Sequence, residues 1–504
     1  MISQYRAITD LSVYPELLKT AASLPHLSSL ISRDRVSQFL LNAPQLSFSY
    51  VGACVTEPLL DLFQKASDEL GLRSQFQQVL AGDIMNFSES RSVRHHQTRS
   101  QVDAGWYGQE RERVFAFATQ ARTQFKQVLH IGIGGSDLGP RAMYEALRRY
   151  VAVSGDEILP VHFVSNLDPD DLLSVVSHLS LKDTLIVLAS KSGTTLETTM
   201  NWTLLTEIAQ AQGISLDQLV KSTVTVTCKG AILDDPKRYR EVFYIDEAIG
   251  GRFSLTSAIG AVGLSCAFGP EIFRRFLAGA AQMDAHAQNA DVTQNAPLLN
   301  AWIGVWERQF LGYSSKAIVP YAQPLSLFVS HLQQLECESN GKSVDRNGQS
   351  ISYPTCPVIW GGLGSISQHS FFQWLHQGSH DSSIQLIGSY ESQFTCPQSH
   401  EALNRNLAAQ LMAFIRGDAH PESPQRHCDG NRSTTLVMLK DLSPESCGAL
   451  LSFYENTVMF QGFIWNINSF DQEAVQLGKR LAVQLETGES DPMLNAIYSL
   501  VRSR

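Results

Sequence analysis

One short segment, residues 190–198 (SKSGTTLET), holds five serine or threonine residues around Gly193, with Lys191 beside them. Hydroxyl groups and free backbone N–H groups at the start of a helix suit the binding of a phosphate dianion. One Ser or Thr would be an ordinary N-cap, but five hydroxyls are more than capping requires. The segment therefore predicts a phosphate site. Its spacing does not fit the Walker A pattern, so a nucleoside triphosphate is not implied.

A second segment of this kind, residues 131–140 (IGIGGSDLGP), is rich in glycine. Glycine lets backbone N–H groups approach an anion closely, and Ser136 offers a hydroxyl. Glycine after a strand is equally common in a plain tight turn. Taken alone, the segment does not separate these two interpretations.

Glu338, His369 and Arg252 are of types that could move a proton or stabilise a negative charge. Glu338 stands just before a glycine turn, and Gln334 shares its helical face four residues earlier. His369 lies near the start of a helix and could transfer protons near neutral pH. Arg252 follows two glycines and could act as a fixed cation for an oxyanion.

Gln472 and Lys479 lie on a late helical pattern and complete the candidate polar set. Each candidate also has an ordinary interpretation, such as a carboxylate facing water, a structural histidine, a surface arginine or a solvated lysine. We interpret His95 and His96 as surface residues without ligand geometry. No metal site is predicted.

Short apolar runs alternate with helical patterns from about residue 127 onward. The runs of a first series are residues 128–133, 161–165, 185–189, 223–227 and 242–245. The runs of a second series are residues 317–321, 358–360, 384–387 and 434–438. Alternation of this kind predicts doubly wound parallel sheets, in which ligands bind at the carboxyl ends of the strands. We therefore expect two α/β units of similar design.

The two ends of the chain have a different pattern. Residues 1–110 have helical spacing, interrupted at residues 86–99 by a polar, basic segment that we expect to be an exposed loop or arm. The part from residue 445 onward also has helical spacing.

Composition limits the class of protein. The 504 residues exceed the size of a single core, so at least two domains are expected. A net charge of −10 argues against nucleic-acid binding by phosphate attraction. The eight cysteines form no zinc pattern and indicate reduced thiols. No signal sequence or membrane-spanning run is found, so a cytoplasmic protein without membrane or nucleic-acid partners is expected.

Taken together, these segments resemble the glucose-6-phosphate isomerase family, and the motifs appear in the family's order over most of the chain. The motifs are IGIGGSDLGP (131–140), SKSGTTLET (190–198), GGRFSLTSAIG (250–260), QQLECESNGK (333–342), QHSFFQWLHQG (368–378) and SFDQEAVQLGK (469–479). Residues 86–99 resemble the family's N-terminal segment less closely. Six motifs in order are far more specific than any one of them, and they outweigh the ordinary interpretations given above.

The resemblance implies a fold of two doubly wound, parallel-sheet sugar isomerase domains with additional N- and C-terminal helices. The expected parts are an N-terminal helical segment packing on the larger domain, two α/β domains and a C-terminal helical tail. Their limits are residues 1–110, 111–275, 276–480 and 481–504.

The resemblance also implies an activity, the reversible isomerisation of glucose 6-phosphate and fructose 6-phosphate through a cis-enediol(ate), in glycolysis and gluconeogenesis. Glu338 would be the base, His369 would open the sugar ring with Lys479 as its helper, and Arg252 would stabilise the enediolate. The expected substrate-binding residues are Ser136, Ser190, Lys191, Ser192, Thr195, Thr198, Gln334 and Gln472. No cofactor or metal is needed. Family members are usually homodimers in which the active-site histidine comes from the partner subunit.

Two other functions stay open at this point. A sugar-phosphate sensor would carry a DNA-binding module and would not need the Glu, His and Lys set. A related isomerase would accept mannose or amino-sugar phosphates, and variation at Thr256 and at residues 365–367 in the expected pocket wall would favour such breadth.

Overall fold

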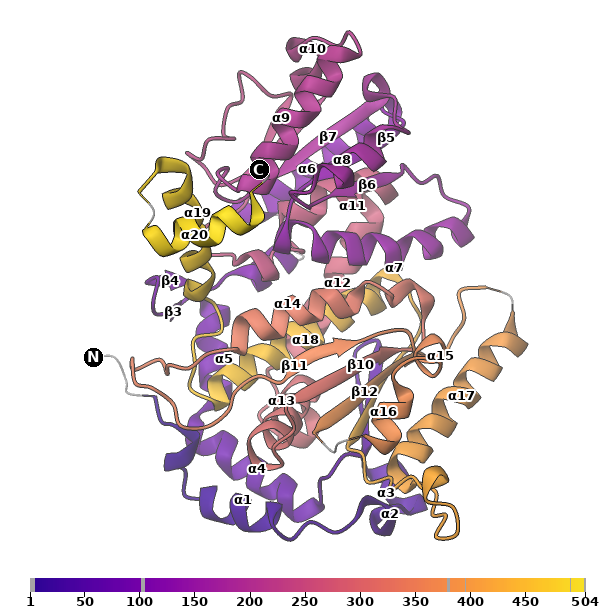
Figure 1. Ribbon diagram of the computed structural model, residues 1–504. Helices are drawn as coiled ribbons and strands as arrows, with labels where there is room; N and C mark the ends of the chain where they lie inside the picture. Colours follow the sequence, from indigo (N-terminus) through magenta and orange to yellow (C-terminus); the bar gives the residue numbers. More distant parts are fainter. Residues whose placement is uncertain (1–4, 101–104, 379–380, 395, 490, 503–504) are drawn as a thin grey trace.

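Two large β-sheets and one short two-stranded sheet, with helices between and around them, make up the computed structural model, which describes residues 5–100, 105–378, 381–394, 396–489 and 491–502 (Figure 1). The first sheet has five parallel strands in the order β6-β5-β7-β8-β9. The strands are β5 (Gln127–Ile131), β6 (Val161–Val164), β7 (Thr184–Ala189), β8 (Thr223–Thr227) and β9 (Glu241–Tyr244). All five agree with the first predicted series.

Helices cover both faces of this sheet. On one face, side chains such as Ile186 and Leu188 of β7 pack against Leu205 of α9 and against α8 and α10. On the other face, Val187 packs in the core shared with α6, α7 and α11. The helices are α6 (Trp106–Gln124), α7 (Leu138–Ser154), α8 (Pro169–Val176), α9 (Leu196–Ala211), α10 (Leu216–Lys221) and α11 (Ala258–Phe268). The sheet is thus doubly wound, as expected.

The second sheet has six strands in the order β1-β2-β13-β12-β10-β11. Four of them are parallel: β10 (Ser315–Pro320), β11 (Val358–Gly361), β12 (Ser382–Ser389) and β13 (Thr434–Leu439). One face of this sheet packs on α16 (Phe372–Gln377) and α17 (Pro397–Arg416), and the other faces the centre of the molecule.

The prediction that the first 110 residues are helical is wrong for the short strand Ile84–Asn86 (β3). It is also wrong for two longer segments, Leu40–Ala43 (β1) and Leu46–Gly52 (β2). They form a hairpin through Gln45, whose φ is 63°, and β2 pairs antiparallel with β13. The second sheet is therefore mixed rather than purely parallel. The other regular elements of this region are α1 (Tyr14–Ala21), α2 (Leu27–Leu30), α3 (Arg33–Gln38), α4 (Glu57–Leu70), α5 (Leu72–Ala81), β3 (Ile84–Asn86) and β4 (Arg91–Ser92).

The expected exposed arm is also wrong for its last residues, His95–Arg99, which form a buried 3₁₀ helix. Arg99 is held by ion pairs to Asp284 and Glu455, two carboxylates that lie far along the chain. His95 stacks on Phe253 with ring centroids 4.7 Å apart, and His96 is buried beside it. These two histidines are therefore not surface residues.

A bundle of helices lies between the two sheets in Figure 1. At its centre is α18 (Pro444–Ile464), which is buried along nearly its whole length. It packs against α12 (Pro270–His286), α13 (Ala296–Val305) and α14 (Phe328–Asn340). Residues near the end of α14 face the loops that follow the strands of the first sheet.

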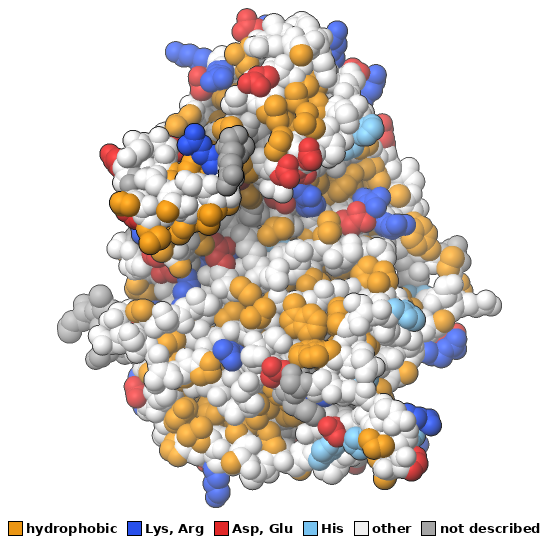
Figure 2. Space-filling model, in the orientation of Figure 1, with side chains coloured by type: hydrophobic (Ala, Val, Ile, Leu, Met, Phe, Trp, Pro, Cys, Tyr) orange, Lys and Arg blue, Asp and Glu red, His pale blue; other side chains and the backbone are white. Residues whose placement is uncertain are grey.

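The chain ends in a helical pair, α19 (Gln476–Thr487) and α20 (Pro492–Val501), drawn in yellow beside β3 and β4 in Figure 1. In the described part of the chain, no residue after Phe470 is buried. Val483, Met493 and Leu500 of this pair are exposed apolar residues. Figure 2 shows apolar side chains on the surface of this region.

The fold class expected from the sequence is confirmed, with the antiparallel hairpin as an addition. The domain limits at residues 110, 275 and 480 stay a prediction. None of the helices that the structure describes is both long and apolar enough to cross a membrane.

Candidate active site

A cleft of about 720 Å³ lies where the loops after β5, β7, β8 and β9 face α14 and the start of the C-terminal helical pair. Most of the residues predicted from the sequence line it. These are Ser136, Ser190, Lys191, Ser192, Thr195, Arg252, Gln334, Glu338, Gln472 and Lys479.

The hydroxyl-rich loop follows β7 and leads into α9. Gly193 has a φ of +71°, which turns the chain so that its N–H donates to Ser190 Oγ at 3.1 Å. Ser190 Oγ and Thr195 Oγ1 are 2.8 Å apart. No side chain in the described residues caps the first turn of α9 at Thr195, so its backbone N–H groups stay available to an anion.

The glycine-rich loop after β5 packs backbone to backbone against the loop that carries Arg252. A Cβ on Gly135 would lie 1.9 Å from the carbonyl oxygen of Gly251, so only glycine allows this approach. The loop is held from below by His130, whose Nε2 lies 2.7 Å from the carbonyl oxygen of Ser136. Burial lowers the pKa of His130 to about 4, and the neutral ring can donate this hydrogen bond.

Lys191 is anchored at the same end of the cleft. Its Nζ donates to the carbonyl oxygens of Glu247 at 2.7 Å and Ile249 at 2.9 Å. Burial lowers its pKa from the ordinary lysine value. A lysine held in this way presents a fixed positive charge near the hydroxyl groups.

Arg252 is the most completely held cation of the cleft. Its Nε donates to Ser339 Oγ at 2.6 Å, its Nη1 to Gln472 Oε1 at 2.9 Å, and its Nη2 to the carbonyl oxygens of Ser469 and Asp471. Burial lowers its pKa, and the negative charge of Glu338 opposes this effect. The guanidinium is therefore fixed in position without being neutralised.

Glu338 approaches this guanidinium from the last turn of α14. Its Oε1 lies 3.7 Å from Arg252 Nη1, and its side chain is 22% exposed. Gln334, on the same face of α14, also lines the cleft, whereas Glu336 points into the core. The helical spacing predicted this arrangement. A carboxylate that is open to the cleft and beside a buried cation can take a proton next to a developing negative charge.

Two predicted residues do not line the cleft. Thr198 lies in the first turn of α9 and is buried, with a hydroxyl that has no hydrogen-bond partner in the described part of the chain. His369 is exposed and follows α15 (Gly364–Ser367) closely in the chain. In Figure 1, α15 lies on the opposite side of the molecule from α19.

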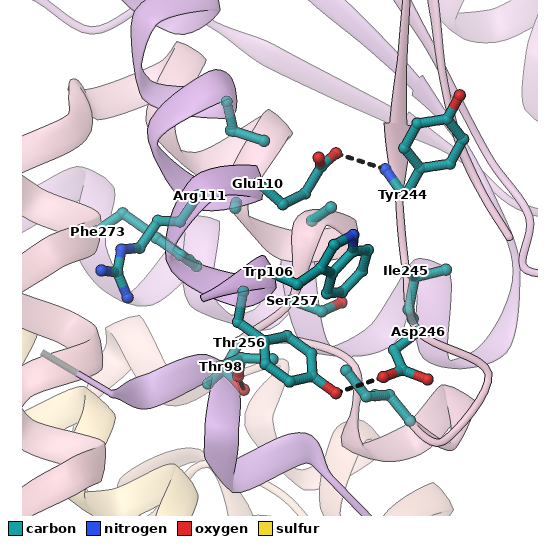
Figure 3. A pocket seen from close by; sticks show the side chains of 15 residues that line it. Thr98, Trp106, Glu110, Arg111, Tyr244, Ile245, Asp246, Thr256, Ser257 and Phe273 are labelled. Carbon is teal, nitrogen blue, oxygen red and sulfur yellow. Dashed lines mark hydrogen bonds between the residues drawn. The ribbon is translucent and has the colours of Figure 1, made fainter. Parts of the chain in front are cut away.

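A smaller cavity of about 20 Å³, large enough for about one water molecule, lies beneath α6 (Figure 3). Tyr107 points its hydroxyl at Asp246, and Glu110 accepts a hydrogen bond from the backbone N–H of Tyr244 at 2.7 Å. Thr256 lines this cavity, where its hydroxyl accepts from Thr98 at 2.7 Å. Its expected place in the wall of the substrate pocket is therefore wrong.

The cleft also contains residues that the sequence analysis did not single out. Glu89 and Arg91 come from the segment around β4, and Lys229 and Glu247 come from loops after β8 and β9. The only signal for the first two was the weak resemblance of residues 86–99 to the family's N-terminal segment.

Comparison with known proteins gives a consistent result. The model of the phosphoglucose isomerase family matches residues 49–496. A glucose-6-phosphate isomerase from Chlamydia muridarum is 41% identical over 481 residues, covering 91% of this chain and 90% of its own. One from Treponema pallidum is 40% identical over 530 residues, covering 98% of both chains.

Solved structures agree with these relatives. The crystal structure of a glucose-6-phosphate isomerase from Chlamydia trachomatis superposes with a TM-score of 0.93 at 38% identity, covering 98% of this chain and 99% of that one. A hypothetical protein from Thermus thermophilus, 22% identical, shares the fold with a TM-score of 0.68, covering 85% of this chain and 97% of its own.

Proposed function

The chain belongs to the phosphoglucose isomerase family of aldose–ketose isomerases, and from this premise we propose that it interconverts glucose 6-phosphate and fructose 6-phosphate. The observation that carries the proposal is the meeting, in one cleft, of Glu338, Arg252 and a hydroxyl-rich loop. This combination matches a substrate with an anionic tail and an acidic C–H next to a carbonyl.

The phosphate binds between the two loops after β5 and β7. Ser190, Ser192 and Thr195 donate hydroxyl hydrogen bonds, and the free N–H groups at the start of α9 add their positive partial charge. Ser136, Lys191 and Gln334 complete the proposed binding set, with Thr198 supporting the first turn of α9. Anchoring the tail in this way supplies binding energy that orients the reacting carbons.

The closed sugar must open before it can isomerise. Lys479, on the first turn of α19, stands at the exposed rim of the cleft and assists proton transfer at the ring, with Gln472 contacting the substrate. His369 is proposed as the main ring-opening group. His369 does not line the cleft of its own subunit. In a homodimer, it would therefore serve the cleft of the partner subunit.

In the open aldose, the Glu338 carboxylate takes the proton from C2 and the electron pair moves toward the carbonyl oxygen at C1. The resulting cis-enediolate is stabilised by the Arg252 cation. Glu338 then returns the proton to C1 while the C2 hydroxyl proton passes to O1, which leaves a carbonyl at C2. A reaction of this kind connects the two hexose phosphates of glycolysis and gluconeogenesis.

The direct test is a coupled assay that follows fructose 6-phosphate formed from glucose 6-phosphate, with mannose 6-phosphate and glucosamine 6-phosphate as alternative substrates. We expect turnover of glucose 6-phosphate to be the fastest. Absence of turnover, or faster turnover of one of the other sugars, would reject the proposed substrate. The Glu338→Gln protein serves as the matched inactive control.

A further inference from the structure

Asp471 joins several segments of the chain that surround the cleft. Its Oδ1 accepts a hydrogen bond from Lys342 Nζ at 2.6 Å. Its Oδ2 accepts from Ser88 Oγ at 2.6 Å and from Asn468 Nδ2 at 2.8 Å. Its carbonyl oxygen accepts from Lys342 Nζ at 2.6 Å and from Arg252 Nη2 at 3.0 Å. One residue thus connects the region of β3 and β4, the end of α14 and the loop that holds Arg252.

The contacts of Asp471 link the segments of the chain that carry Glu338 and Gln472. Lys342 stands four residues after Glu338, so its ion pair with Asp471 ties the end of the helix that carries Glu338 to the loop at residues 468–472. Gln472, the next residue, accepts from Arg252. Asp471 itself is not among the residues that line the cleft, so it acts through its neighbours.

Asp471 also stands at the base of the C-terminal helical pair. Phe470 is the last buried residue in the part of the chain that the structure describes, and Lys479 follows on a helix without a buried residue. The hydrogen bonds of Asp471 are therefore well placed to set the direction in which this pair leaves the body of the protein.

The charge of Asp471 stabilises the positive charge of the nearby Lys342. The side chains of Lys342 and Asp471 are 16% and 14% exposed. Burial lowers the pKa of Lys342, and the nearby Arg252 adds to this effect, whereas Asp471 opposes it. Removing the negative charge would leave two neighbouring cations without this compensation in a poorly hydrated place.

We infer that Asp471 is a positioning residue for the isomerisation: its carboxylate ties the end of α14, which carries Glu338, to the loop at residues 468–472. That loop in turn binds the Arg252 guanidinium and leads into the segment with Gln472 and Lys479. The inference rests on the proposed function. It adds a residue that touches no substrate, yet sets the distances among the groups that do.

The test is the Asp471→Asn protein, which keeps the shape of the side chain and removes its charge. We expect kcat for glucose 6-phosphate to fall about 10- to 100-fold, because small displacements of reacting groups have effects of this size. KM should change much less, since the loops that bind the phosphate are not altered. Lys342→Met should have a similar effect, and the double variant should lose less than the product of the two single losses.

Glu445→Gln is the matched control, because Glu445 forms a partly buried ion pair with Arg275 away from the cleft, with Nε and Oε1 2.7 Å apart. We expect it to lower the unfolding temperature comparably and to leave kcat unchanged. Unchanged kcat in Asp471→Asn, or a loss confined to KM, would overturn the inference while wild-type activity still supports the proposed function. If Asp471→Asn does not fold, an unchanged kcat in Lys342→Met would overturn it. An inactive wild-type protein would instead reject the proposed function itself.

Discussion

The carboxylate of Glu338 lies 3.7 Å from the guanidinium of Arg252, and the same guanidinium donates a 2.6 Å hydrogen bond to Ser339, the next residue along the chain. The helix end that carries the proposed base is therefore fixed directly to the proposed oxyanion-stabilising cation. Arg252 also donates to the carbonyl oxygens of Ser469 and Asp471, so the loop at residues 468–472 is bound to the same guanidinium. The base and the cation are thus placed relative to each other before a substrate enters.

Replacing Arg252 with alanine should lower turnover more than it lowers affinity. The cation is proposed to act on charge that develops only in the enediolate, so its loss should reduce kcat by about 10²- to 10³-fold. Steady-state kinetics with glucose 6-phosphate provide the measurement. A raised KM with normal kcat would mean that Arg252 only binds the substrate.

Replacing Gly135 with alanine should weaken the phosphate site. The new Cβ would meet the carbonyl oxygen of Gly251 at 1.9 Å, and the two loops would have to separate. We expect the dissociation constant for a sugar phosphate, measured by calorimetry, to rise about tenfold or more, which corresponds to about 1.4 kcal/mol. Gly263→Ala, where the nearest atom would be His130 Nδ1 at 3.5 Å, is the control and should bind normally.

The strands and the loops that follow them could be predicted because buried parallel strands are continuous apolar runs ending at glycine or hydroxyl residues. The common face of Gln334 and Glu338 followed from helical spacing. In contrast, the burial of Arg99 depends on Asp284 and Glu455, which are remote in sequence, so local polarity wrongly suggested an exposed arm. The pairing of β2 with β13 is equally non-local.

The position of His369, outside the cleft of its own chain, allows a complementation test. If two subunits share each site, a dimer of one Glu338→Gln subunit and one His369→Ala subunit has one site with both native residues. Mixing and exchanging the two inactive proteins should restore about one quarter of wild-type activity, since about half of the dimers would be mixed in a twofold assembly. Continued inactivity despite verified subunit exchange would contradict the shared site.

The buried histidines make stability depend on pH. Burial lowers the pKa of His331 to about 4, and neither of its ring nitrogens has a hydrogen-bond partner in the described part of the chain. In the unfolded chain, the imidazole of His331 binds a proton near pH 6.5, whereas in the folded protein it does so only near pH 4. The contribution of neutral His331 to the free energy of unfolding is therefore complete above pH 6.5 and is lost as the pH falls toward 4.

The free energy of unfolding should fall between pH 7 and pH 5.5 in both proteins. We expect the fall to be about 1 kcal/mol smaller in His331→Leu than in the wild type, because the variant lacks the buried imidazole. Urea unfolding at the two pH values measures the difference. His178→Leu, at an exposed position, should behave like the wild type. An identical pH dependence in the His331 and His178 variants would contradict the prediction.

The proton transfer assigned to Glu338 can be observed directly by incubating glucose 6-phosphate with the protein in deuterated water and following deuterium at C2 by NMR. The wild-type protein should exchange this hydrogen as it isomerises the sugar. Glu338→Gln should keep its fold and its affinity for the sugar phosphate but lose exchange by about 10²- to 10⁴-fold. Exchange at a rate close to the wild type in Glu338→Gln would show that another group carries the proton, and the proposed mechanism would be wrong.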